Sequence, residues 1–311
     1  MMYEPHISWK REEPMRQTEA MSARFRGLDS WRDEEILEAF WAGQARAIAA
    51  VRPALPAIAA AARAIAARIE PDGRLVYVGA GSSGRQAALD GMELGATFSW
   101  PDHRVALVLA EGSKLELGSV GRFEDNEQDA RTRIGELALG PSDVMIAVAA
   151  SGRTPFTRAA AEAARQAGAL VVAIANNSEA PLLKIADVPI LLETGAEVIS
   201  GSTRMNAGTA HKAVLGLLSS LTMTRLGHVY DGLMVSMRFE NAKLRQRAAE
   251  IVAEIAGCSE KDASRALQSC GGSIKAAALV MRGADPEQAE RLLAEAGGTL
   301  RVALERLAPP A

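Results

Sequence analysis

Five short apolar runs alternate with longer segments of helical periodicity through the middle of the chain. Each run has only four or five residues and is rich in Val, Ile and Leu, which is typical of strands buried on both faces. Alternation of this kind predicts an α/β fold, with a parallel sheet between two layers of helices. The predicted strands are residues 75–78, 105–109, 144–148, 170–174 and 188–192. Because proline has no N–H to donate, Pro189 indicates that the last strand lies at an edge of the sheet.

Helical patterns precede this central region. One helix is expected from about residue 31 to 51 and a second from there to Ile69, before a Pro-Asp-Gly turn. Charged residues and Pro53 interrupt the apolar stretch 47–69, which therefore predicts a buried helix and not a membrane span. The residues Ser-Trp-Arg-Asp at 30–33 resemble a capping box. Residues 1–28 have no apolar period and are expected to form an arm that is ordered only by packing on something else.

The sequence pattern changes after residue 250, where it predicts a series of short helices with clear N-cap and stop signals. The segment contains an internal repeat: Ser259 corresponds to Asp285 as a helix N-cap, and a Gly-Gly pair at 271–272 corresponds to one at 297–298 as a helix stop. We therefore expect a small all-helical C-terminal unit. The predicted division is an N-terminal arm at 1–29, an α/β domain with N-terminal helices at 30–240, and a helical domain at 241–311.

Composition excludes several classes of function. The chain has 311 residues with 35 basic and 38 acidic side chains, so nothing calls for a nucleic acid or an anionic membrane as partner. Aromatic residues are only 4%, which argues against a base-stacking surface. The two cysteines match neither a disulfide framework nor a metal motif, and no metal is expected. The polar, charged N-terminus has no secretory pattern, so a cytoplasmic location is expected.

The end of the first strand carries the clearest chemical signal. The sequence Gly-Ala-Gly-Ser-Ser-Gly at 79–84 separates the strand from a helical pattern that starts at Arg85. Such a turn collects unpaired N–H groups at the positive end of a helix dipole and favours an anion. The hydroxyls of Ser82 and Ser83 can donate further hydrogen bonds to phosphate oxygens.

A second small turn follows the third strand and repeats this logic. Residues 150–155 read Ala-Ser-Gly-Arg-Thr-Pro, and the proline suits the first turn of the next helix. Ligands of parallel α/β sheets bind at the carboxyl ends of the strands, where both turns lie. We interpret Ser151 and Gly152 as ligand contacts, whereas Thr154 has the alternative role of a purely structural N-cap.

Several titratable residues are candidates for catalysis or binding. Glu93 lies beside the apolar positions Leu89 and Met92, and a carboxyl held there would be partly desolvated, with a raised pKa that suits proton donation; the alternative is an exposed helix glutamate. Arg204 and Lys212 are eight residues apart and fit either a phosphate or carboxylate contact or two surface charges. His211 is interpreted as structural. The acidic residues of the loop 112–126, Glu124 and Asp125 among them, are by composition most typical of solvated surface.

Four ordered blocks carry a resemblance to a known family. They are VYVGAGSSGR at 76–85, DVMIAVAASGRTPF at 143–156, TGAEVISGSTRMNAGTAHK at 194–212 and LMVSMRFENAKLRQRA at 233–248. With these blocks the chain resembles the bacterial N-acetylmuramic acid 6-phosphate etherases of the sugar isomerase (SIS) superfamily, which are related to glucokinase regulatory proteins. The resemblance implies a three-layer SIS sandwich with a five-stranded parallel sheet, a UBA-like helical C-terminal domain, and a homodimer with shared active sites.

The resemblance also implies a reaction, the cleavage of the D-lactyl ether of N-acetylmuramic acid 6-phosphate to N-acetylglucosamine 6-phosphate and D-lactate, in the recycling of cell-wall amino sugars. Glu93 matches the family glutamate that protonates the departing lactate, and Glu124 matches the one that acts as base. The residues expected to hold the sugar phosphate are Ser82, Ser83, Gly84, Ser151, Gly152, Arg153, Thr154, Ser202, Thr203 and Lys212.

The chemistry of the reaction agrees with two carboxyl groups. Breaking the ether at C3, next to the acidic C2 proton of the open-chain sugar, is an elimination that needs a base for the proton and an acid for the leaving group. Water then adds with the roles reversed. Two carboxyls in different environments supply this without a metal or an organic cofactor.

The sequence departs from the family pattern at several places. Leu94-Gly95-Ala96 replaces Cys-Pro-Pro, Asn206 replaces a lysine, His211 replaces a glutamine, and the N-terminal element is reduced to Thr18-Glu19 before Ala-Met-Ser; the loop 112–123 is atypical too. We expect these departures to surround the reacting end of the sugar. They leave two alternatives to a plain etherase open: a paralog with an altered phosphosugar substrate, and a phosphosugar-binding regulatory protein. An aldose–ketose isomerase and a DNA-binding regulator fit less well.

Overall fold

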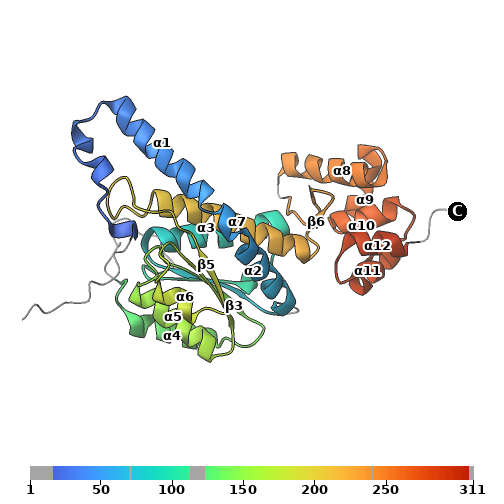
Figure 1. Ribbon diagram of the computed structural model, residues 1–311. Helices are drawn as coiled ribbons and strands as arrows, with labels where there is room; N and C mark the ends of the chain where they lie inside the picture. The colour runs from blue at the N-terminus through green and yellow to red at the C-terminus, as the bar shows by residue number, and fades with distance from the viewer. Residues whose placement is uncertain (1–16, 70–71, 113–122, 240, 308–311) are drawn as a thin grey trace, which may run out of the picture.

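The five apolar runs form one parallel sheet in the computed structural model of the chain (Figure 1). The structure describes residues 17–69, 72–112, 123–239 and 241–307. The strand order is β2-β1-β3-β4-β5, so Pro189 does lie in an edge strand, as predicted. In the register of the sheet Gly79 lies opposite both Leu109 and Val148, so the carboxyl ends of the three strands β2, β1 and β3 are level. The strands are β1 (Leu75–Gly79), β2 (Val105–Leu109), β3 (Val144–Val148), β4 (Leu170–Ala175) and β5 (Val188–Leu191).

Helices cover both faces of the sheet, which confirms the predicted three-layer α/β sandwich. Successive strand residues point to opposite faces, so Tyr77 and Ile146 pack in one hydrophobic core while Val76 and Met145 pack in the other. The first face is covered by α2 (Leu55–Arg68), α3 (Gly81–Phe98), α7 (Asn206–Arg225) and the end of α1 (Asp33–Ala49), and the second by α4 (Glu127–Leu137), α5 (Pro155–Gln166) and α6 (Pro181–Ile185).

The two N-terminal helices differ in how they are buried. By length and composition alone the stretch Asp33–Arg68 is apolar enough to cross a membrane, but a short 3-10 turn at Arg52–Ala54 divides it. As predicted, α2 is a core helix, with Ile58 and Ile65 buried on the sheet. Only small residues of α1 are buried, and Figure 1 shows α1 standing away from the sheet over most of its length.

The predicted capping box at 30–33 is wrong by two residues. The helix α1 begins at Asp33, and its box is closed by Glu35, whose carboxylate accepts a hydrogen bond from the backbone N–H of Arg32 at 3.1 Å. Ser30 instead donates its hydroxyl to the carbonyl of Gly27 at 2.7 Å. Three acidic residues, at 33–35, occupy the first turn of the helix, so the sequence pattern alone did not show which of them closes the capping box.

The described part of the N-terminal arm packs on loops at the carboxyl end of the sheet. It consists of 3-10 turns at Gln17–Glu19, Ala23–Phe25 and Leu28–Ser30. Thr18 is fully buried, and its hydroxyl accepts a hydrogen bond from Asn177 Nδ2 at 3.1 Å. Ser200 donates to the carbonyl of Glu19 at 3.0 Å. Residues 1–16 of the predicted arm, and residues 113–122 of the loop noted as atypical, lie outside the described residues.

The C-terminal helices share a hydrophobic cluster of their own. Figure 1 shows them gathered beyond the end of α7, apart from the sheet. The repeat signals are confirmed: the side chains of Ser259 and Asp285 cap α9 and α11, and both Gly-Gly pairs follow these helices with positive φ. The elements are a hairpin of β6 (Val229–Tyr230) and β7 (Leu233–Met234), and the helices α8 (Ala242–Ala256), α9 (Glu260–Ser269), α10 (Ile274–Met281), α11 (Pro286–Glu295) and α12 (Leu300–Arg306).

Candidate active site

The glycine–serine segment after β1 is the first turn of α3 and not a preceding loop. The helix begins at Gly81, four residues before the predicted start. Gly81 has a φ of 54°, which favours glycine. Gly79 and Gly84 allow strand and helix to pass closely, because a Cβ on Gly79 would lie 2.7 Å from the Cα of Gly84. Ser82 and Ser83 therefore carry their hydroxyls and backbone N–H groups at a helix N-terminus.

The second turn lies beside the first, because β3 pairs directly with β1. The backbone N–H of Arg153 donates to Ser151 Oγ at 3.2 Å, which gives the turn its shape. Gly152 has a φ of 64°, and a Cβ there would overlap the side chain of Ala180. Thr154 precedes α5, but its side chain makes no capping hydrogen bond. The structure therefore gives no support to the purely structural alternative for Thr154.

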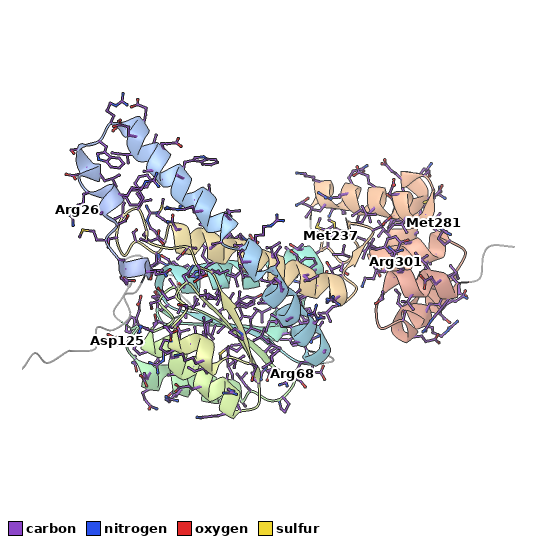
Figure 2. The ribbon with its side chains drawn as sticks, viewed as in Figure 1. Arg26, Arg68, Asp125, Met237, Met281 and Arg301 are labelled. Carbon is purple, nitrogen blue, oxygen red and sulfur yellow. The ribbon has the colours of Figure 1, made fainter. Side chains whose placement is uncertain are left out.

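The backbone of Glu124 is hydrogen-bonded to the helix that follows this second turn. Its carbonyl accepts a hydrogen bond from the backbone N–H of Phe156, in the first turn of α5, at 2.9 Å. The side chain is half-buried, and burial raises the pKa of its carboxyl, with further contributions from the negative charges of Glu111 and Asp125. Figure 2 shows where this loop lies: Asp125, the residue after Glu124, is at the opposite end of the sheet layers from Arg68. A carboxylate with a raised pKa is a stronger base, which suits proton abstraction from carbon.

Glu93 forms an ion pair with Lys212 across α3 and α7, with Nζ and Oε2 3.3 Å apart. The two side chains are 57% and 44% exposed, so the expectation of a partly desolvated Glu93 is wrong for the single chain. The helix turns a different face inward: Ala87, Leu94 and Phe98 fill the core. Leu89 and Met92 are instead 42% and 64% exposed.

A hollow of about 590 Å³ opens between α1, α3 and α7. It brings together Arg204 and Lys212, which the sequence had left as either ligand contacts or surface charges. Ser202 and Thr203 belong to the loop before α7, where the carbonyl of Thr203 accepts from the N–H of Gly208 at 2.9 Å. The described residues that line the hollow are Ile48, Gln86, Leu89, Arg204, Gly208, Thr209, Lys212 and Ala213. Neither Glu93 nor Glu124 is among them.

Two departures from the family pattern lie in the interior of the chain. Asn206 is fully buried and donates Nδ2 to the carbonyl of Ala196 at 3.3 Å, while Glu197 accepts the N–H groups at the start of α7. His211 is also fully buried, with Nε2 2.7 Å from Asn176 Oδ1. The burial and hydrogen bond of His211 confirm its structural interpretation, whereas the expectation that these departures surround the reacting end of the sugar stays a prediction.

His211 makes the stability of the chain depend on pH. Burial penalises the charged ring and lowers its pKa from 6.5 to about 4. The buried Nδ1 meets no hydrogen-bond partner in the described part of the chain. The unfolded chain therefore binds a proton that the folded chain resists, and stability is lost as pH falls from about 6.5 towards 4. We expect His211 to cost the wild type about 2 kcal/mol between pH 7 and pH 5.

The measurement is the Tm at pH 7 and pH 5 for the wild type and His211→Gln. The glutamine does not titrate and can donate to Asn176, so its Tm should fall less. His228, whose pKa burial also lowers to about 4, is present in both chains and serves as the internal reference. Equal losses of Tm in the two proteins would contradict the prediction.

Two further polar residues, which are not among the site residues predicted from the sequence, lie at the carboxyl edge of the sheet. Glu111 comes two residues after β2, and its carboxylate accepts a hydrogen bond from the N–H of Gly81 at 2.6 Å. Asn177 comes two residues after β4 and donates to the carbonyl of Ala150 at 3.0 Å. Both follow apolar runs of strand length, so their position at a strand end is the sequence signal that marks them, as it marks the two turns.

Comparisons with known proteins agree with this architecture. Residues 39–176 match the SIS domain family. The chain is 44% identical over 290 residues to the N-acetylmuramic acid 6-phosphate etherase of Deinococcus radiodurans, covering 93% of this chain and 95% of that protein. It is 42% identical over 288 residues to the etherase of Streptomyces coelicolor, covering 92% and 93%. A Bacteroides fragilis structure, assigned as a phosphosugar isomerase involved in capsule formation, shares the fold with a TM-score of 0.50 and 21% identity, covering 64% of this chain and 93% of that one.

Proposed function

The chain belongs to the N-acetylmuramic acid 6-phosphate etherase family, and on that premise we propose that it cleaves the D-lactyl ether of N-acetylmuramic acid 6-phosphate. The products are N-acetylglucosamine 6-phosphate and D-lactate, and the enzyme is a carbon–oxygen lyase. The observation that supports this function most directly is the environment of Glu124. Its carboxyl is half-buried and has a raised pKa. Its backbone is hydrogen-bonded to the start of α5, beside two hydroxyl-rich turns.

The two turns hold the phosphate of the sugar. The first turn of α3 offers N–H groups and the positive end of a helix dipole, and the turn before α5 offers hydroxyls from a neighbouring strand end. Arg153 adds a positive charge. The side chains in this role are Ser82, Ser83, Ser151 and Thr154, with Gly84 and Gly152 allowing close approach, and Ser202, Thr203 and Lys212 as further contacts. Fixing the remote phosphate orients the reacting carbons.

Glu124 removes the proton from C2 of the open-chain sugar, where the C1 aldehyde stabilises the carbanion. The electron pair then forms the C2–C3 double bond as the C3–O bond breaks. Glu93 donates the proton to the departing lactate oxygen. In the second half water adds at C3 and C2 takes a proton back, with the two carboxyls exchanging roles.

The test of this function is the release of D-lactate by the purified protein from N-acetylmuramic acid 6-phosphate. We expect one equivalent of D-lactate for each N-acetylglucosamine 6-phosphate, and in D₂O one deuterium at C2 of the product. No D-lactate, together with a raised Tm in the presence of the sugar phosphate, would contradict the proposal and favour a phosphosugar-binding regulatory protein.

We also propose that the protein is a homodimer, with the second copy covering the outer face of α1 and α3. Four large apolar side chains are exposed there: Leu37, Trp41, Leu89 and Met92. The spacing of Leu37 and Trp41 puts them on one side of α1, the helix that stands away from the sheet in Figure 1. Exposed large apolar side chains such as these favour association, because burying them removes apolar area from water.

The active sites of this dimer are shared. Glu93 follows the exposed Met92 in α3 and pairs with Lys212, and both charged side chains are exposed in the single chain. The backbone of Glu124 is hydrogen-bonded to the start of α5. The hollow between α1, α3 and α7 is lined by neither glutamate. A second copy packed on α3 supplies the missing half of each site, and it also removes the Glu93 carboxyl from solvent.

The division of the chain into an arm at 1–29, a sugar-phosphate domain at 30–240 and a UBA-like helical domain at 241–311 is likewise a proposal. The separate hydrophobic cluster of the C-terminal helices supports it, as does the repeat of capped helices within that cluster. Limited proteolysis that cuts near residue 240 and leaves two folded fragments is the expected result.

A further inference from the structure

The carboxylate of Glu111 contacts the turn that we propose binds the phosphate. It follows β2, the neighbour of β1, and its side chain crosses to the first residue of α3, where Oε1 lies 2.6 Å from the N–H of Gly81. The backbone supports this approach, since the N–H of Ala110 donates to the carbonyl of Gly79 at 3.1 Å. A negative charge interacts favourably with the positive end of a helix dipole, so this hydrogen bond stabilises the turn that carries Ser82 and Ser83.

The same carboxylate interacts with Glu124 as a like charge. Asp125, on the same loop, is the other negative group that acts on Glu124. On the helices that follow this loop and the second turn, Arg133 of α4 pairs with Asp129 at 2.7 Å and Arg158 of α5 pairs with Glu162 at 3.9 Å. Among the described residues, the turn before α5 carries a further cation, the half-buried Arg153.

We propose that Glu111 is a positioning residue of the etherase reaction, which fixes the first turn of α3 through Gly81 and sets a negative charge beside Glu124. The proposal rests on the proposed role of Glu124 as base. The two effects of Glu111 come from different properties of one side chain. Its oxygen atom is the acceptor for the N–H of Gly81, and its charge acts on Glu124.

These two effects are separable by substitution. In Glu111→Gln the amide oxygen still accepts the hydrogen bond from Gly81, but the charge is gone. In Glu111→Ala both are gone. Without the charge the pKa of Glu124 falls, so Glu124 stays ionised to lower pH. The acid limb of kcat/KM for D-lactate release then moves to lower pH.

The experiment is the pH profile of kcat/KM for the wild type and both variants, with Glu127→Gln as the matched control. Glu127 stands three residues after Glu124, is exposed, and pairs with Arg131 at 3.6 Å. In Glu111→Gln we expect the ratio of kcat/KM at pH 5 to that at pH 8 to rise about threefold, with KM at pH 8 changed less than about twofold. In Glu111→Ala we expect KM to rise about tenfold as well, because the turn that binds phosphate loses its acceptor. Glu127→Gln should follow the wild type.

An acid limb in Glu111→Gln that coincides with those of the wild type and Glu127→Gln overturns the proposal. A loss of folding is recognised from the Tm of each variant. Titration of the ¹³C-labelled glutamate carboxyl groups separates this failure from a failure of the proposed function. The Glu124 resonance, assigned by its loss in Glu124→Gln, should titrate at lower pH in Glu111→Gln whether or not lactate is formed. An unchanged midpoint also overturns the proposal.

Discussion

Replacement of Glu124 by glutamine is expected to lower kcat/KM for D-lactate release by about a thousandfold, or about 4 kcal/mol of transition-state stabilisation. The amide keeps the shape of the side chain but cannot take the C2 proton. The half-buried environment makes this loss large, because a carboxyl with a raised pKa is a stronger base than an exposed one. The binding of the phosphosugar should change little, since the two turns that hold the phosphate are untouched.

The matched control is Asp125→Asn, which removes a neighbouring exposed carboxylate from the same loop. We expect its kcat/KM to stay within about tenfold of the wild type, because Asp125 acts on Glu124 only through its charge. The measurement is D-lactate release under saturating and limiting substrate, with the Tm of each variant as a check on folding. A Glu124→Gln enzyme with more than a tenth of the wild-type kcat/KM would show that another group is the base.

A mixture of two inactive variants is expected to recover activity if the active sites are shared. Chains with Glu93→Gln and chains with Glu124→Gln, combined in equal amounts and allowed to exchange subunits, form heterodimers as half of all dimers. One site of each heterodimer then has an intact Glu93 from one chain and an intact Glu124 from the other. The activity should rise from near zero to about a quarter of the wild-type value.

The alternative arrangement gives a different result. If both glutamates of a site came from one chain, every site of the heterodimer would lack one of them and mixing would restore nothing. The control is Met92→Glu in both variants: it places a charge on the apolar face of α3 that we propose the second copy covers. That change should prevent both dimer formation, measured by light scattering, and the recovery of activity.

Much of the site was accessible from residue type and position. The turn at 150–155 was identified because hydroxyls follow a predicted strand, and the structure brings it beside the first turn of α3. Glu124 was not distinguished from the other acidic loop residues by composition. Its identification came from the family resemblance. Burial and the negative charge of Glu111 raise the pKa of Glu124, and both depend on how the fold places its loop against α5 and the end of β2.

The sequence by itself determined the features that arise from contacts between near neighbours. The five strands follow from short apolar runs whose two faces must both be buried, and the caps at Ser259 and Asp285 follow from hydrogen bonds to residues three positions away.

Only the tertiary structure decided which faces and side chains are inside. The pattern around Glu93 favoured Leu89 and Met92 as a buried face, yet the packing of α3 on the sheet and α7 uses Ala87, Leu94 and Phe98 instead. Asn206 and His211 became interior residues because their partners, 10 and 35 positions away, are brought to them by the fold. Such pairings depend on the relative placement of whole elements, which no local pattern contains.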